Sequence, residues 1–125
     1  MQFIETSAAP LPAGHYSQAV VHQGLVYVSG ILPITPDGTK LTDANIELQT
    51  LQVLQNLEAI LEAAGASKET VLKTTVYVSD MEDWPKINPI YAAFFENHRP
   101  ARAIVPVGIL HYGLNIELEA VAAVV

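Results

Sequence analysis

The chain has no cysteine, few basic side chains and no long apolar run. Without cysteine, the protein cannot form disulfides, thiolate metal sites or a cysteine nucleophile. Six basic residues against thirteen acidic ones give a formal net charge of −7 at pH 7, which repels a phosphate backbone. We therefore expect no nucleic-acid partner. Proline, glycine and polar residues interrupt the uncharged segments, so we expect no membrane span. The N-terminus, residues 1–5, lacks a basic region followed by an apolar run, so we expect no export signal. The lack of cysteine is compatible with the cytoplasmic location that we expect.

Charge is scarce overall, since 15% of the 125 residues are charged against about 25% in typical soluble domains. The length suits one domain, residues 1–125, with a single core. A folded monomer of this mass exposes on the order of 6,500 Å², which so few charges cover thinly. We therefore expect an oligomer.

Residue periodicity and turn signals predict the secondary structure. Gln23-Gly24 is a two-residue hairpin loop, because glycine accepts the positive φ that such loops need. The first helix is amphipathic, with Thr42 or Asp43 as its N-cap and Gly65 at its end. In chain order, the expected elements are a strand over 2–5, hairpin strands over 17–22 and 25–29, a helix over 45–64, a strand over 71–78, a helix over 84–97, and strands over 102–107 and 115–124.

The second predicted helix has Asp83 as its cap and Pro85 in its first turn. Pro89 removes a helical hydrogen bond, so we expect either a kink there or a helix that starts near Asn88. The element order implies an α+β fold, in which two helices cover one face of a mixed sheet. So short a chain has nothing left for the other face, and we expect a partner subunit to cover it.

Arg102 is one of only two arginines and lies in an otherwise apolar predicted strand. A buried guanidinium without an anion is costly. Two interpretations remain open at this point. Arg102 could form a structural salt bridge to a carboxylate of this chain or of its neighbour, or it could bind a ligand carboxylate in a bidentate pair.

Strand alternation puts Glu117 and Glu119 on one face of the last predicted strand, roughly 7 Å apart. A solvated sheet edge is one interpretation of this pair. Val121, Ala123 and Val125 continue the same face, however, and suit a partly buried surface better. A carboxylate on such a surface can have a raised pKa and act as a general acid or base.

The four histidines show no metal-ligand spacing, and no phosphate-binding loop or dinucleotide fingerprint is present. We expect no metal and no cofactor. Gly14-His15-Tyr16-Ser17 and Val28-Ser29-Gly30 place hydroxyls and glycine backbone beside the hairpin strands, which by itself is ordinary turn chemistry.

Several segments together resemble the RidA (YjgF) family of reactive-intermediate deaminases, and they run through nearly the whole chain in one order. Each is unspecific alone, and the ordered set is a strong signature. The segments are Gly14-His15-Tyr16-Ser17-Gln18, Val28-Ser29-Gly30, Glu62-Ala63-Ala64-Gly65-Ala66, Val71-Leu72-Lys73-Thr74-Thr75-Val76-Tyr77-Val78, Asn88 with Tyr91-Ala92-Ala93-Phe94-Phe95, Pro100-Ala101-Arg102 and Ile116-Glu117-Leu118-Glu119-Ala120.

The resemblance implies a chorismate-mutase-like fold that assembles as a homotrimer around a central β-barrel, with sites in the clefts between subunits. It also implies cofactor-free hydrolysis of 2-imino and 2-enamino acids, such as 2-aminoacrylate and 2-iminobutyrate, to 2-keto acids and ammonium. Position by position, Arg102 matches the arginine that grips the substrate carboxylate, and Glu117 matches the glutamate that positions water. Tyr16, Ser29, Gly30 and Asn88 match other pocket residues.

The chain departs from the family pattern at several positions. The usual cysteine two residues after the arginine is Ile104, which leaves a backbone N–H to face the substrate. The usual proline before Tyr16 is His15, and Pro89 directly follows Asn88. The segment 108–114 lacks the family's basic residues, which changes the expected rim of the pocket.

A non-catalytic regulatory module of the same fold, binding a small carboxylate, is the alternative to an imine deaminase. Retention of both Arg102 and Glu117 favours catalysis, because binding alone needs only the arginine. Ribonuclease activity or translation inhibition fits poorly with the net charge of −7. Chorismate mutase activity needs more cationic side chains for a dianion than two arginines supply.

Overall fold

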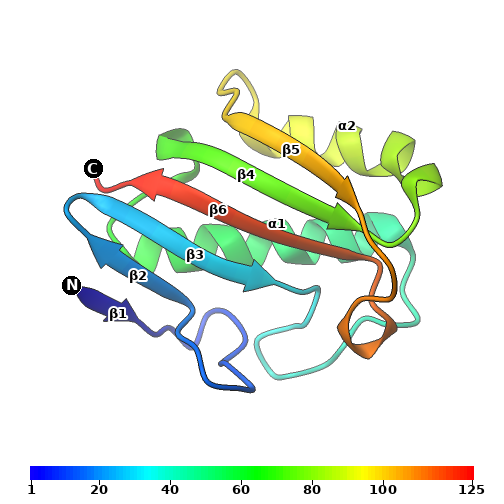
Figure 1. The fold of residues 1–125 in the computed structure, drawn as a ribbon, viewed down its shortest axis with the longest axis horizontal. Helices are drawn as coiled ribbons and strands as arrows, with labels where there is room; N and C mark the ends of the chain where they lie inside the picture. Colours follow the sequence, from blue (N-terminus) through cyan, green and yellow to red (C-terminus); the bar gives the residue numbers. More distant parts are fainter.

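The computed structural model describes residues 1–125, which form one six-stranded mixed sheet with both helices packed on the same face (Figure 1). The strand order is β1-β2-β3-β6-β4-β5, and only the β4–β5 pair is parallel. The α+β prediction of two helices on one face of a mixed sheet is thus confirmed. The elements are β1 (Gln2–Ile4), β2 (Ala19–His22), β3 (Leu25–Ile31), α1 (Ile46–Ala63), β4 (Val71–Val78), α2 (Trp84–Phe95), β5 (Ala101–Pro106) and β6 (Ile116–Ala123), with short 3-10 turns η1 (Lys68–Thr70), η2 (Met81–Asp83) and η3 (His111–Gly113).

The β2–β3 hairpin forms where the sequence predicts it. Gln23 and Gly24 both have positive φ, 51° and 79°, which is the backbone that a two-residue loop between twisted strands requires. Ala19 pairs with Val28 and His22 with Leu25. The side chains of Val26 and Val28 consequently point into the core, while Tyr27 points out of it.

Helix α1 packs its predicted apolar stripe on the sheet, and its N-cap differs from the prediction. Asn45 is the cap, because its side chain accepts a hydrogen bond from the Leu48 amide at 2.8 Å. Thr42 lies three residues before this cap, and its hydroxyl donates to the Tyr112 carbonyl at 3.1 Å. At the other end Gly65 has the expected positive φ, 78°. The buried apolar residues of α1 are Ile46, Val53, Leu54, Leu57, Ile60 and Leu61.

Helix α2 starts at Trp84 and continues through Pro89, so the alternative start near Asn88 is wrong. Asp83 stands at the N-cap position, but its side chain makes no capping hydrogen bond. The physical reason for the early start is packing. Ile87, Tyr91 and Phe95 lie four residues apart on the buried face, on both sides of Pro89, and their burial offsets the hydrogen bond that proline removes.

Strand β6 lies in the middle of the sheet and separates two environments. Ile116, Leu118, Ala120 and Ala122 are buried beneath the helices, whereas Glu117 and Glu119 are half-buried on the opposite face. β6 pairs with β3 on one side and β4 on the other, so the solvated-edge interpretation of the glutamates is wrong. No helix covers that second face (Figure 1), and neither helix is long and apolar enough to cross a membrane.

Candidate functional site

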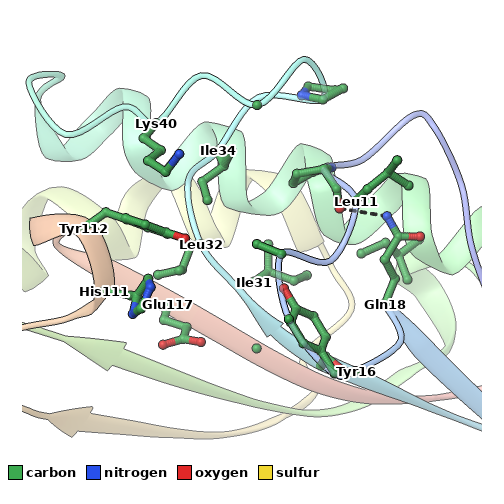
Figure 2. Close-up of a pocket in the computed structure, with 18 of the residues that line it drawn as sticks. Leu11, Tyr16, Gln18, Ile31, Leu32, Ile34, Lys40, His111, Tyr112 and Glu117 are labelled. Carbon is green, nitrogen blue, oxygen red and sulfur yellow. Dashed lines mark hydrogen bonds between the residues drawn. The ribbon is translucent and has the colours of Figure 1, made fainter.

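A pocket of about 930 Å³ opens at the end of the sheet where β3 ends and β6 begins (Figure 2). Loop residues 10–16, the end of β3, loop residues 32–40 and the η3 turn form its walls. Four of the predicted site residues line it: Tyr16, Ser29, Gly30 and Glu117. The fold therefore brings together residues that are 101 positions apart in the chain.

Glu117 is the only carboxylate on β6 that lines this pocket. Burial is the main cause that raises the pKa of Glu117 above its ordinary value of 4.5, and the negative charge of Glu119 adds to the rise. Gly30 lies directly against the carboxylate, because a Cβ at position 30 would collide with Glu117 Oε2. The absence of a side chain at Gly30 is what lets the carboxylate reach the pocket from the centre of the sheet.

Ser29 and Tyr16 form the wall of the pocket on the hairpin side. The Ser29 hydroxyl donates to the Ser17 carbonyl at 2.6 Å, and the Ser29 amide donates to the Gln18 carbonyl at 3.0 Å. The Ser29 oxygen keeps its lone pairs and can accept a hydrogen bond from a ligand. The ring of Tyr16 extends into the pocket beside Ile31 (Figure 2) and remains exposed.

Glu119 has a side-chain hydrogen-bond partner in this chain, whereas Glu117 has none. The Tyr77 hydroxyl donates a hydrogen bond to Glu119 Oε1, and this bond is the main cause that raises the pKa of Tyr77. Glu119 faces a second, smaller hollow of about 410 Å³ that Glu117, Gly30 and Tyr77 also line. Glu117 makes no side-chain hydrogen bond to the protein, so its oxygens are free for water or a ligand.

Arg102 lies in a different place, on the edge strand β5. Its guanidinium stacks over the rings of Trp84 and Tyr91, at 4.9 and 5.0 Å, and Nη1 donates to Asn88 Oδ1 at 3.2 Å. No carboxylate of this chain pairs with it, since the one ion pair is Lys68–Glu96 at 3.9 Å. The guanidinium is exposed rather than buried, so the expectation of a buried cation in an apolar strand is wrong for the single chain.

Two groups of predicted site residues therefore face opposite sides of the sheet. Arg102 pairs with Thr74 and Ile104 with Val76, two β4 residues whose side chains are buried on the helix side. Glu117 pairs with Tyr77, which alternates to the open side. Within one chain Arg102, Asn88 and Ile104 do not meet Tyr16, Ser29, Gly30 and Glu117.

Lys40, His111 and Tyr112 also line the pocket, and the sequence singled out none of them as a site residue. Lys40 Nζ lies 4.6 Å from the centre of the Tyr112 ring, and the rings of His111 and Tyr112 meet edge to face at 4.0 Å. Tyr112 has a φ of 60°, which a residue pattern does not reveal for a non-glycine residue. The structure groups no three histidine or carboxylate side chains that could hold a metal.

Comparison with known protein families identifies the family of this chain. The family described as Endoribonuclease L-PSP matches residues 6–124. The chain belongs to this family. A RutC family protein of Pyrococcus horikoshii is 44% identical over 121 residues, which cover 97% of this chain and 96% of the relative. The chloroplastic Reactive Intermediate Deaminase A of Arabidopsis thaliana is 39% identical over 97% of this chain and 65% of its own length. The resemblance to RidA proteins is thereby confirmed.

Solved structures of the L-PSP family superpose closely on this chain. RidA from a Psychrobacter species has a TM-score of 0.94 at 37% identity, and the match covers 98% of this chain and 99% of the other. TdcF of E. coli, solved with bound serine, has a TM-score of 0.93 at 35% identity and covers 98% of both chains. The names in this family include both deaminases and an endoribonuclease, so membership alone does not decide the activity.

Proposed function

We propose that the protein hydrolyses reactive 2-imino and 2-enamino acids to 2-keto acids and ammonium, without a cofactor, at sites that form between subunits of a homotrimer. The observation that carries this proposal is the separation of two complementary half-sites on opposite faces of the sheet. One half offers a free carboxylate in a pocket, Glu117, and the other offers an exposed, unpaired guanidinium, Arg102.

The Arg102 half suits a small carboxylate ligand. A guanidinium with no carboxylate partner binds such a group in a bidentate pair. The two aromatic rings and Asn88 fix the orientation of the guanidinium before the ligand arrives. Serine in the related TdcF structure is a small amino acid of the same size class as 2-aminoacrylate, which supports this substrate class.

The Glu117 half suits activation of one water molecule. A protonated imine carbon is already electrophilic, so the carboxylate needs only to accept a proton as the water oxygen bonds to C2 of the substrate. The C=N π electrons move to nitrogen, which gives a carbinolamine. Glu117 then returns the proton to the amine. As the C–N bond breaks, the carbinolamine O–H bond also breaks, and its proton passes through the Glu117 carboxylate to the departing ammonia, so the products are the 2-keto acid and ammonium.

A trimer explains how the two halves meet. The open face of the sheet carries Leu25, Tyr27, Val121 and Ala123, and no element of this chain covers it. Three such sheets, arranged as a central β-barrel, bury these residues and bring the β5 edge of one subunit towards the pocket of the next. Arg102 and Glu117 of one site then come from different subunits.

The direct test is a coupled assay with freshly generated 2-iminobutyrate and 2-aminoacrylate. The proposal predicts faster release of 2-keto acid than the uncatalysed reaction, unaffected by a chelator. Absence of any acceleration, together with binding of a small carboxylate that depends on Arg102, would favour the alternative of a non-catalytic regulatory module.

A further inference from the structure

The pocket of Glu117 contains a histidine for which the proposed chemistry has no role so far. His111 lies in the η3 turn, six residues before Glu117, and its ring and the Glu117 carboxylate face the same pocket (Figure 2). The imidazole is exposed to solvent, whereas the carboxylate is half-buried at the centre of the sheet. His111 therefore lines the pocket from its solvent-exposed part, and Glu117 lines it from the sheet.

The imidazole of His111 packs against the neighbouring Tyr112, which is itself held in place. The His111 ring meets the Tyr112 ring edge to face at 4.0 Å. Loop residues 33–44 hold Tyr112 in turn, because Lys40 lies over its ring at 4.6 Å and the Thr42 hydroxyl donates to its carbonyl at 3.1 Å. The turn itself needs the positive φ of Tyr112, 60°, followed by Gly113 at 70°. These contacts order a side chain that would otherwise be free at the surface.

The groups around Glu117 differ in whether they favour or disfavour ionisation of its carboxylate. From β6, the Glu119 carboxylate disfavours ionisation of Glu117, and the Tyr77 hydroxyl on β4 binds Glu119 rather than Glu117. Burial disfavours ionisation as well, and the positive charge of His111 opposes both effects. Lys40 and Asp37 line the same pocket, but Lys40 is engaged with Tyr112 and Asp37 with the hydroxyls of Thr35 and Thr39.

We propose that His111 is a positioning residue whose imidazole faces the same pocket as the Glu117 carboxylate and, as a cation, keeps that carboxylate charged and directed into the pocket. This inference rests on the proposed function, and it adds a group that widens the pH range in which Glu117 accepts the proton of water. Histidine suits this role because it gains its charge as the pH falls towards the range where a carboxylate becomes protonated.

The first test is the pH profile of kcat/KM for 2-iminobutyrate. In His111→Gln the acidic limb should move to higher pH by roughly 0.5 units, since a single charge several ångströms away near a protein surface has an effect of that order. His111→Lys keeps a cation and should restore the limb to its wild-type position or below. His22→Gln is the matched control, because it removes an exposed histidine at the far end of the β2–β3 hairpin.

A second measurement does not depend on activity. The carboxyl carbon of Glu117 can be followed by NMR in protein labelled at glutamate side chains, with Glu117→Gln to assign the signal. The pH at the midpoint of the Glu117 titration should rise in His111→Gln and remain unchanged in His22→Gln. An unchanged midpoint in His111→Gln overturns the role of His111 even if the enzyme is active. A raised midpoint in a protein without deaminase activity supports the charge coupling and refutes the proposed function instead.

Discussion

The two half-sites differ in how complete they are within one chain. Glu117 lies on the central strand β6, where Gly30, Ser29 and the η3 turn already surround it with a formed pocket. Arg102 lies on the edge strand β5, above α2, where aromatic rings orient it but nothing encloses it (Figure 1). The Glu117 half-site is a formed pocket with a free carboxylate, and the Arg102 half-site is an oriented but uncovered cation. We expect this combination of a site that is completed only when subunits assemble.

The largest effect on turnover should come from Glu117→Gln. Glutamine keeps the shape of the side chain but cannot accept the proton of water, so kcat should fall by roughly 10² to 10⁴. Binding of a 2-keto acid, measured by calorimetry, should change little. A kcat within a few-fold of wild type would remove Glu117 from the chemistry.

Arg102→Ala should lower kcat/KM by roughly 10² to 10³, because a charge-assisted bidentate pair to the substrate carboxylate is lost. Since the guanidinium is exposed and pairs with no carboxylate of the chain, folding should not need it. Native mass spectrometry should still show the assembled protein. Dissociation or unfolding of this variant would instead support a structural salt bridge to a neighbouring subunit.

Gly30→Ala should impair the function of the Glu117 half-site and leave the Arg102 half-site unchanged. The added Cβ collides with the Glu117 carboxylate, which must swing away from the pocket. We expect kcat to fall by roughly 10-fold to 100-fold, since misplacement of a catalytic group by about 1 Å has effects of this size. KM should stay nearly unchanged, and a selective rise in KM would contradict this assignment.

Glu119→Gln should have a smaller effect on turnover than any of these changes. Glu119 is bound by the Tyr77 hydroxyl and lines only the smaller hollow. Removing its charge lowers the pKa of Glu117, so the acidic limb of the rate profile should move to lower pH, which a pH series of kcat/KM measures. Equal losses in Glu117→Gln and Glu119→Gln would mean that the pair acts jointly.

The smallest expected effect is on stability. The pKa of Glu117 is higher in the folded protein than in the unfolded chain, so ionisation of Glu117 costs stability as the pH rises through that interval, and the cost persists above it. Glu117→Gln removes this cost. Its melting temperature should equal or slightly exceed that of the wild type at pH 7, and the difference should vanish near pH 4. A lower melting temperature at pH 7 would contradict the desolvation argument.

Local signals in the sequence predicted most of the elements, and the family resemblance pointed to four residues that line one pocket, Tyr16, Ser29, Gly30 and Glu117. The strand β4 (Val71–Val78) and the alternation of β6 follow from residue pattern alone, and that alternation correctly placed Glu117 on a half-buried face. The cap of α1 was missed by two or three residues, because Thr42, Asp43 and Asn45 are all residue types that cap helices, and the residue pattern does not show which of them accepts the hydrogen bond from the Leu48 amide.

The environment of Arg102 could not be predicted because it depends on strand order. A parallel β4–β5 pair at the edge of the sheet leaves Arg102 exposed above α2, whereas a central β5 would have buried it. His111 was missed for a related reason. The turn that aims its ring into the pocket depends on the left-handed backbone of Tyr112 and on contacts from residues 33–44.

The most direct test of a site shared between subunits is complementation between Arg102→Ala and Glu117→Gln. Each variant alone should be nearly inactive. The two are mixed in equal amounts, unfolded and refolded together so that hybrid assemblies form. Random assembly of a ring should restore about a quarter of the wild-type activity, because one interface in four then pairs an intact Arg102 with an intact Glu117 of the neighbour. Activity no higher than that of the separate variants, in refolded hybrids of the correct mass, would show that the two residues do not form a site across subunits.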